Sequence, residues 1–569
     1  MYTRLVTVLI FYLNFKEIKA DELEVCMDTL GCIEGTYKPG SEVQQYEAFL
    51  GIPYAKPPIG ELRFRSPVPV EPWKGKLLAK TLQADCIQKN YFLSPAVVSG
   101  EEDCLYLNVY RPALRSADKL PVLFYIHGGG FFTGSPGLLF YGPEYFMDTN
   151  ETILVIPGYR LGPFGFLSTG DEHMTGNFGL KDQNLALKWV QSHISAFGGD
   201  PSRVTIFGHS SGGVSTHLHM LSSASKGLFR NAISISGLAI SAFARPIDSK
   251  AQTIKMAVAV GITNASKMSS KELVDALRKI ESTKLVEACD ALKIWNVYPF
   301  VNFRPTIEKE SWPQPFLTTD IFKLFDNKPP KTVPWISAVL PSKGEGTVLA
   351  LRLAADPALQ AEFNEKFDEL LKVTLEFPAV GKPEKVNEAL QLLVAEYMGG
   401  AHELNNGTVT GFLEIFGDAN FHYPFYKTMV ANVNSGAAAQ SPIRLLTFDY
   451  RGPYSYSTLF SGTMDNFGTA HIDDTLFLFR APLIAPKGYL KSSPEVKLVK
   501  SYVGLYVEFA KTGNIEIFNE INSCTKDTLA AQGFCDYLSI VKEKDLFRAN
   551  NTWNIKRMKL WESVYKLVY

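Results

Sequence analysis

The chain has 569 residues, of which 46% are hydrophobic and 20% charged, and its formal net charge is −1. This composition is typical of a soluble globular protein with a large core, and its balanced charge argues against a nucleic-acid partner, which requires a basic face. After the N-terminus, no segment reaches about 18 uninterrupted apolar residues, so the sequence predicts no membrane anchor.

The first 20 residues have the pattern of a secretory signal peptide. Arg4 precedes an apolar run at residues 5–15, and Ala20 is a small residue at which cleavage could occur. We therefore expect a secreted, extracellular protein in which residues 21–569 form a single domain.

Cysteines and glycosylation sequons agree with an extracellular location. Proximity in the sequence predicts three disulfides and leaves Cys289 free; the pairs are Cys26–Cys32, Cys86–Cys104 and Cys524–Cys535. Four Asn-x-Ser/Thr sequons are candidate glycan sites, at Asn150, Asn264, Asn406 and Asn550.

Short apolar runs alternate with helical patterns along the chain. Strands buried on both faces are expected at residues 122–126, 153–156, 204–207, 232–235, 335–340 and 445–448, and a helix is expected at 182–197. This alternation predicts an α/β fold with a central, mostly parallel twisted sheet flanked by helices. The helix-rich stretches at about 245–330 and 350–440 are expected as insertions over the carboxyl edge of the sheet, where substrate pockets form.

The pentapeptide Gly208-His209-Ser210-Ser211-Gly212 is a candidate nucleophile elbow. A predicted strand runs directly into it and a helical stretch at 213–221 follows, which is the setting in which such a turn exposes a serine hydroxyl. An ordinary Ser/Gly-rich loop would lack these flanking elements. Ser210 is therefore the candidate nucleophile.

A serine nucleophile requires a base and an acid that orients the base. In α/β-hydrolases the order along the chain is serine, acid, histidine. His217 and His219 lie on the predicted helix after Ser210 and could not reach its Oγ, which leaves His402, His422 and His471. We favour His471, because it lies in a glycine-bearing loop beyond a late strand. Glu345, between two glycines just past the strand at 335–340, is the favoured acid, and Asp418 is the alternative.

The segment His127-Gly128-Gly129-Gly130 directly follows the strand at 122–126. Consecutive glycines let backbone N–H groups approach a substrate closely. Such donors stabilise the oxyanion of acyl transfer by about 2.7–4 kcal/mol each. The segment is therefore a candidate oxyanion-hole loop.

These motifs, together with longer strings, resemble the type-B carboxylesterase family of α/β-hydrolases. The strings are FLGIPYAKPPIGELRF at 49–64, EDCLYLNV at 102–109, GNFGLKDQ at 176–183 and FGGDP at 197–201. The resemblance implies a Ser210–Glu345–His471 triad and an oxyanion hole made by the N–H groups of Gly129, Gly130 and Ser211. It also implies a Cys86–Cys104 disulfide and the ion pairs Arg63–Glu102 and Arg160–Asp182.

Two features depart from the family pattern. The family usually has Glu before and Ala after the nucleophile, where this chain has His209 and Ser211. The segment between Cys86 and Cys104 contains no Trp. In cholinesterases a Trp in this loop binds quaternary ammonium groups by cation–π attraction, so choline esters are expected to be poor substrates.

The sequence thus predicts a secreted serine hydrolase of apolar carboxylic esters, with a small-molecule ester as its partner and no metal or organic cofactor. Juvenile hormone esterase activity is the second candidate, because the pattern Gly468-x-x-His471-x-x-Asp474 resembles one found in juvenile hormone esterases. Their usual elbow, however, has Gln before and Ala after the serine. A non-catalytic adhesion protein of the same family is disfavoured, because the triad is complete and no membrane span is visible.

Overall fold

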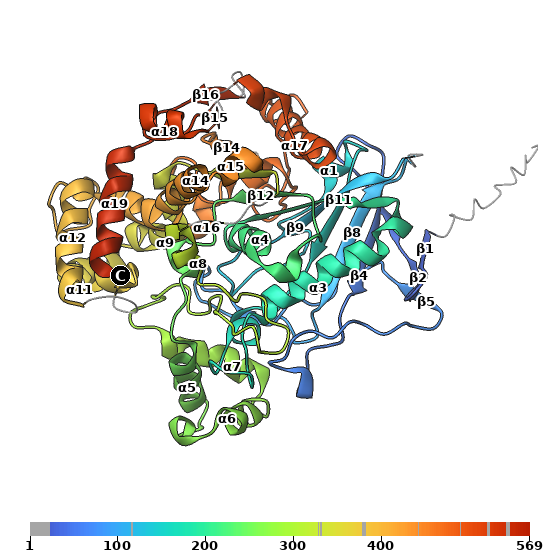
Figure 1. Cartoon of the computed structure of the whole chain (residues 1–569), viewed down its shortest axis with the longest axis horizontal. Coiled ribbons are helices and arrows are strands. Elements are labelled where there is room, and N and C mark those ends of the chain that lie inside the picture. Colours follow the sequence, from blue (N-terminus) through green and yellow to red (C-terminus); the bar gives the residue numbers. More distant parts are fainter. Residues whose placement is uncertain are drawn as a thin grey trace, which may run out of the picture.

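An 11-stranded sheet in the order β16-β15-β14-β13-β12-β11-β9-β10-β8-β4-β3 forms the centre of the molecule (Figure 1). The computed structural model describes residues 23–114, 118–327, 329, 333–377, 383–441, 443–489, 491–520, 524–541 and 547–569. The predicted signal peptide lies outside these residues. The strands are β3 Thr36–Lys38, β4 Tyr46–Pro53, β8 Tyr106–Pro112, β9 Leu120–Ile126, β10 Ile153–Pro157, β11 Gly199–His209, β12 Asn231–Ile235, β13 Trp335–Val339, β14 Ile443–Phe448, β15 Tyr537–Ile540 and β16 Arg548–Asn550.

The middle of this sheet is parallel, from β10 through β9, β11, β12, β13 and β14 to β15. Antiparallel strands complete both edges: β16 on one side, and β8, β4 and β3 on the other. The six predicted strand positions are all confirmed. Their apolar runs are continuous because the parallel strands are covered on both faces; residues 122–126 of β9, for example, are fully buried.

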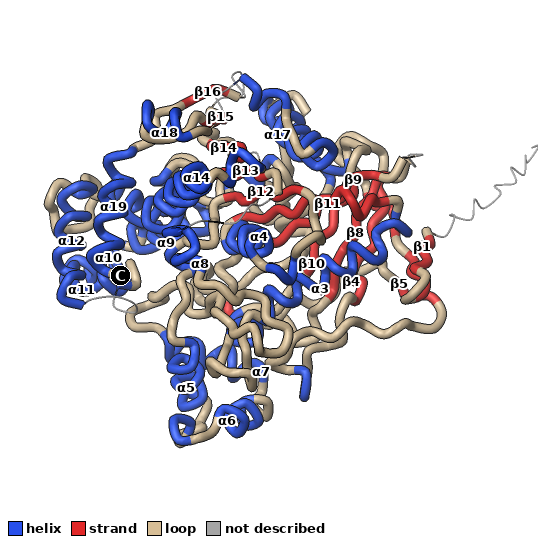
Figure 2. The backbone as a smooth tube through the Cα atoms, in the orientation of Figure 1, coloured by secondary structure: helices blue, strands red, loops and turns tan. Residues whose placement is uncertain are grey.

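Helices surround the sheet (Figure 2). They are α1 Glu144–Met147, α2 Gly162–Phe166, α3 Phe178–His193, α4 Ser211–Leu221, α5 Ser249–Ala259, α6 Ser270–Leu277, α7 Ser282–Glu287, α8 Ile321–Asn327, α9 Ser342–Ala355, α10 Pro357–Glu365, α11 Phe367–Thr374, α12 Pro383–Met398, α13 Val409–Gly417, α14 Tyr423–Ser435, α15 Ala437–Gln440, α16 Ser457–Ser461, α17 Pro494–Thr512, α18 Lys526–Gln532 and α19 Ile555–Val568. The helix expected at 182–197 begins earlier, at Phe178, and its last residues form a 3₁₀ turn, Ile194–Phe197.

The two stretches expected as helical insertions do contain helices. Residues 245–330 supply α5 to α8, and α5, α6 and α7 lie together at one end of the view in Figure 1. Residues 350–440 supply α10 to α15, and α12 packs against the C-terminal α19 (Figure 1). In the part of the chain that the structure describes, no helix is long and apolar enough to cross a membrane.

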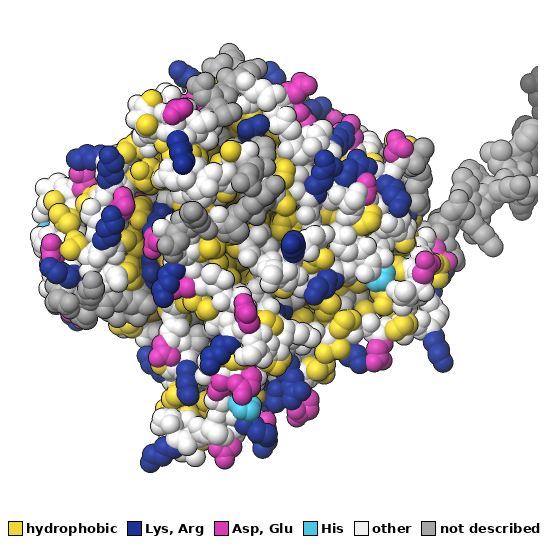
Figure 3. All heavy atoms as spheres, viewed as in Figure 1, with side chains coloured by type: hydrophobic (Ala, Val, Ile, Leu, Met, Phe, Trp, Pro, Cys, Tyr) yellow, Lys and Arg dark blue, Asp and Glu magenta, His cyan; other side chains and the backbone are white. Residues whose placement is uncertain are grey.

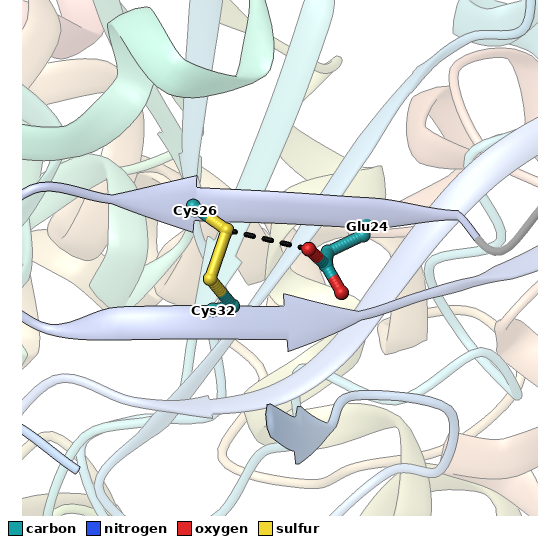
Figure 4. A group of neighbouring side chains, drawn as sticks. All are labelled: Glu24, Cys26 and Cys32. Carbon is teal, nitrogen blue, oxygen red and sulfur yellow. Dashed lines mark hydrogen bonds between the residues drawn. A yellow bond between two sulfur atoms is a disulfide. The ribbon is translucent and has the colours of Figure 1, made fainter. Parts of the chain in front are cut away.

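The three predicted disulfides are present, Cys26–Cys32, Cys86–Cys104 and Cys524–Cys535, and Cys289 is free and buried. The first joins the short strands β1 Glu24–Met27 and β2 Gly31–Glu34, which form a separate small sheet with β5 Lys76–Leu78. The Glu24 carboxylate lies beside this disulfide (Figure 4). Because both sulfurs are bonded to each other, this cluster offers no thiolate to a metal ion.

The four sequons lie at different degrees of exposure. Asn264 and Asn406 are exposed, whereas Asn150 and Asn550 are half-buried. Glycosylation at these positions stays a prediction. On the face shown in Figure 3, Lys and Arg side chains lie among Asp and Glu side chains rather than in one basic area.

Candidate active site

Ser210 occupies a tight turn between β11 and α4. Its backbone has φ 59° and ψ −124°, a conformation that a non-glycine residue adopts only when its surroundings enforce it. The elbow packs directly on β9: a Cβ added to Gly212 would lie 2.0 Å from the carbonyl oxygen of Ile126. Glycine at this position is therefore a steric requirement of the turn, as the elbow motif predicts.

The glycine loop after β9 lies against the elbow. A Cβ added to Gly128 would lie 3.1 Å from the Cβ of Ser210. Gly129 has φ +116°, and a Cβ there would lie 1.9 Å from the Thr133 carbonyl oxygen, so no other residue fits this backbone. Within the described residues, the N–H groups of Gly129 and Gly130 donate no hydrogen bond. Two free donors thus lie in the loop that contacts the nucleophile turn.

Ser211, the third candidate donor, is the first residue of α4. The first four N–H groups of a helix have no partner within the helix, so its N–H group is available to a negative charge. The side chain is buried and differs from the usual Ala only by a hydroxyl group. The backbone donor is the same for either residue.

Glu345 lies in the first turn of α9 directly after β13, so it is on a helix and not in a loop. It is fully buried, and its Oε1 accepts hydrogen bonds from the Leu340 N–H (2.7 Å) and the Ser236 hydroxyl (2.6 Å). Its Oε2 lies 2.5 Å from His471 Nδ1. Burial raises the pKa of Glu345 to about 7, although the two donors oppose this shift.

His471 follows β14 and precedes the 3₁₀ turn Asp473–Phe477. Its N–H donates to the Gly344 carbonyl (2.9 Å), so this loop is attached directly to the first turn of α9. The ring is fully buried and packs against Phe421, with ring centroids 4.8 Å apart. Burial holds the pKa of His471 well below its ordinary value. With Nδ1 facing the carboxylate, Nε2 has no hydrogen-bond partner among the described residues.

The alternative acid, Asp418, has other partners. It lies in the π-helical turn Asp418–His422, accepts a 2.5 Å hydrogen bond from the Ser342 hydroxyl, and accepts a second from the Tyr397 hydroxyl. No hydrogen bond joins it to His471 within the described chain. Burial raises the pKa of this carboxyl. Asp418 therefore belongs to a separate polar network.

The other candidate histidines do not face the glutamate. His422 Nε2 donates to the Leu340 carbonyl (2.7 Å), and His402 lies at the surface with Nδ1 2.6 Å from Asp368 Oδ1. Ser236 was not among the sequence candidates. Its only signal is its place immediately after β12, at the same edge of the sheet as Ser210.

Aromatic side chains surround the glycine loop. The Phe132 ring contacts those of Phe92 and Phe300, at centroid distances of 5.3 and 5.8 Å. Phe92 and Phe300 also line a small pocket, whose wall includes Val348 and Leu349 of α9. This space is mostly apolar and lies next to the loop that carries the two free donors.

A second small pocket shares Phe300 and Leu349 with the first. Phe243 lines it, and the Phe243 ring contacts Phe421, the ring that packs on His471 (5.8 Å). Aromatic side chains in contact thus extend from these pockets to His471 and to the glycine loop.

Two ion pairs, Arg160–Asp182 fully buried and Arg63–Glu102 partly buried, join segments around the sheet. Arg160 contacts Asp182 through Nη2–Oδ1 (2.7 Å) and Nε–Oδ2 (2.8 Å), and Arg63 contacts Glu102 in the same bidentate manner. Both pairs are as the family resemblance implies.

Comparisons with known proteins agree with this geometry. The model of the carboxylesterase family matches residues 21–543. A juvenile hormone esterase of Tribolium castaneum is 39% identical over 502 residues, covering 86% of this chain and 84% of that protein. Venom carboxylesterase-6 of Apis mellifera is 32% identical over 523 residues, covering 90% of each. The crystal structure of juvenile hormone esterase from Manduca sexta with OTFP covalently attached has a TM-score of 0.80 and 27% identity, covering 96% of this chain and 100% of that one. The chain belongs to the carboxylesterase family, as a carboxylic ester hydrolase with the α/β-hydrolase fold.

Proposed function

We propose that this carboxylesterase hydrolyses apolar esters by acyl transfer through Ser210, His471 and Glu345. The observation that carries the proposal is the 2.5 Å contact between His471 Nδ1 and Glu345 Oε2, at the edge of the sheet where Ser210 lies. A carboxylate at Nδ1 holds the imidazole in the tautomer whose Nε2 can accept a proton. A serine hydroxyl is too weak an acid to attack an ester without such a base.

In the first step, Nε2 of His471 takes the proton of the Ser210 hydroxyl as Oγ attacks the ester carbonyl. The carbonyl oxygen becomes an oxyanion, which the N–H groups of Gly129, Gly130 and Ser211 stabilise. His471 then protonates the leaving alcohol, and the acyl-enzyme remains. Water repeats the sequence, with His471 as the base, and releases the acid. Glu345 stabilises the imidazolium that forms in each step.

The aromatic side chains beside the glycine loop favour an apolar substrate. Burial of hydrocarbon against such side chains contributes about 25 cal/mol per Å² to binding. Hydrolysis of juvenile hormone, the methyl ester of a sesquiterpenoid, is the second candidate. The 39% identity with the Tribolium castaneum juvenile hormone esterase favours this activity. The elbow argues against it, because His209 and Ser211 stand where juvenile hormone esterases usually have Gln and Ala.

The complete constellation at the sheet edge favours an enzyme over a non-catalytic adhesion protein. We further propose that the protein is secreted after removal of residues 1–20, with glycans on its exposed sequons. The three disulfides support an oxidising compartment. Because the central sheet takes strands from Thr36 to Asn550, residues 21–569 are proposed to form one catalytic domain.

The test is covalent labelling of the purified protein with a fluorophosphonate, followed by peptide mapping. The label should be on Ser210, and no label should appear on the S210A variant. Labelling elsewhere, or none at all, would refute the assignment. Competition between juvenile hormone and naphthyl acetate for the same preparation then separates the two substrate classes, since the better substrate has the higher kcat/KM.

A further inference from the structure

His209 is a buried histidine that the proposed acyl transfer does not use. Its side chain is 1% exposed, and neither ring nitrogen makes a hydrogen bond of good geometry within the described residues. Its nearest charged partner is Asp474, whose Oδ1 lies 3.3 Å from His209 Nε2. A polar ring buried in this way is costly unless a charge or dipole compensates it.

Asp474 has no solvent exposure either. Its other oxygen, Oδ2, accepts a hydrogen bond from the Tyr502 hydroxyl at 3.2 Å. One phenol is a weak partner for a buried carboxylate, which normally requires a cation or several donors. His209 is thus the group placed to compensate the charge of Asp474.

The pair lies directly against the proposed base. The rings of His209 and His471 are in edge contact, with centroids 4.7 Å apart and planes at 68°. Glu345 is a second acid that interacts with His209. The phenols that interact with Asp474 have pKa values raised by burial and stay neutral; they are Tyr125, Tyr456, Tyr502 and Tyr506.

We propose that His209 and Asp474 form a buried pair that positions the His471 imidazole and balances the charge around it. This makes His209 a positioning residue, and the inference rests on the proposed roles of Ser210, His471 and Glu345. The three side chains come from different elements: the end of β11, the loop after β14 and the turn Asp473–Phe477.

The two members of the pair act on His471 in opposite directions. Burial is the main cause that lowers the pKa of His471; a charge on His209 lowers it further, and the Asp474 carboxylate raises it. A positive charge on His209 also lowers the pKa of Glu345. Loss of His209 therefore leaves the negative charge of Asp474 uncompensated. This charge favours protonation of the His471–Glu345 pair, whether the proton is on the imidazole or on the carboxylate.

The test is the pH dependence of kcat/KM for a p-nitrophenyl ester in the H209Q and D474N variants. H209Q should shift the acid limb to higher pH by about one unit, because the Asp474 charge close to His471 is then uncompensated. D474N should shift it downward, and the double variant should lie between the two singles. A packing role alone would lower kcat in these variants without opposite shifts of the pH profile.

The matched control is H402Q, which alters the His402–Asp368 pair at the surface. This variant should leave the pH of the acid limb unchanged. Acid limbs that are unshifted, or that move in the same direction for both variants, would overturn the inference. Because D474N changes no side-chain volume, it tests the pair even where H209Q does not fold. Failure of the proposed function looks different: the native protein would then show no labelled Ser210.

Discussion

His471 Nδ1 lies 2.5 Å from Glu345 Oε2, although the two residues are separated by 126 positions in the chain. Two main-chain features bring them together. Glu345 lies in the first turn of α9, shortly after β13, and the His471 N–H donates to the carbonyl of Gly344 in the same turn. The hydrogen bond between the side chains is thus supported by a backbone bond one residue away, which restricts the position of the imidazole.

Replacement of Ser210 by Ala should abolish ester hydrolysis, because no other hydroxyl lies on the elbow in the nucleophile position. We expect kcat to fall by about 10⁴-fold or more, as in other serine hydrolases. The measurement is p-nitrophenyl acetate turnover. The S223A variant, which changes an exposed serine just after α4, should retain native turnover; substantial activity in S210A would exclude Ser210 as the nucleophile.

Replacement of Glu345 by Gln should reduce kcat by about 10³–10⁴-fold with little change in fold. Gln keeps the volume but removes the charge that stabilises the imidazolium and orients Nδ1. The D418N variant distinguishes the two acid candidates. Since Asp418 binds Ser342 and Tyr397, we expect D418N to lower the free energy of unfolding by about 1.5–3 kcal/mol while kcat changes little. The reverse pattern would assign the acid role to Asp418.

Replacement of Gly129 by Ala should reduce kcat by about 10²-fold or more. The added Cβ would collide with the Thr133 carbonyl and displace the loop that carries the proposed oxyanion donors. The matched control is G399A: Gly399 also has positive φ (+62°) but nothing within 4 Å of the added Cβ. It should cost only about 1 kcal/mol of stability. Equal kcat values for the two variants would contradict the role of the loop.

Activity should fall as the pH is lowered through about 7. The active form has a neutral His471 and an ionised Glu345, and burial raises the pKa of Glu345 to about 7 while it lowers that of His471. His471 and Glu345 therefore titrate as a coupled pair, and uptake of one proton by the pair converts the enzyme to an inactive form. A pH profile of kcat/KM should show a single acid limb of one proton near this value. A profile that stays flat down to pH 5 would contradict the prediction.

Local patterns in the sequence were sufficient for six strands of the sheet and for two parts of the site. The apolar runs predict the six central strands because a parallel sheet buried on both faces requires continuous apolar sequence. The elbow and the glycine loop are recognisable because each is one contiguous segment directly after a strand. Their glycines answer local steric needs, as Gly212 against Ile126 and Gly129 against Thr133 show.

What no local pattern contains is the pairing of residues from different strand ends. The sequence alone left Glu345 and Asp418, and three histidines, as alternatives. Only the tertiary structure shows that His471 hydrogen-bonds to Glu345, whereas Asp418 accepts hydrogen bonds from Tyr397 and Ser342. The hydrogen bond from Ser236 to Glu345 and the proximity of His209 to Asp474 are likewise visible only in the tertiary structure. These relationships depend on strand order and on how late loops pack across the sheet edge, because hydrogen bonds and charges act over a few ångströms of space and not along the chain.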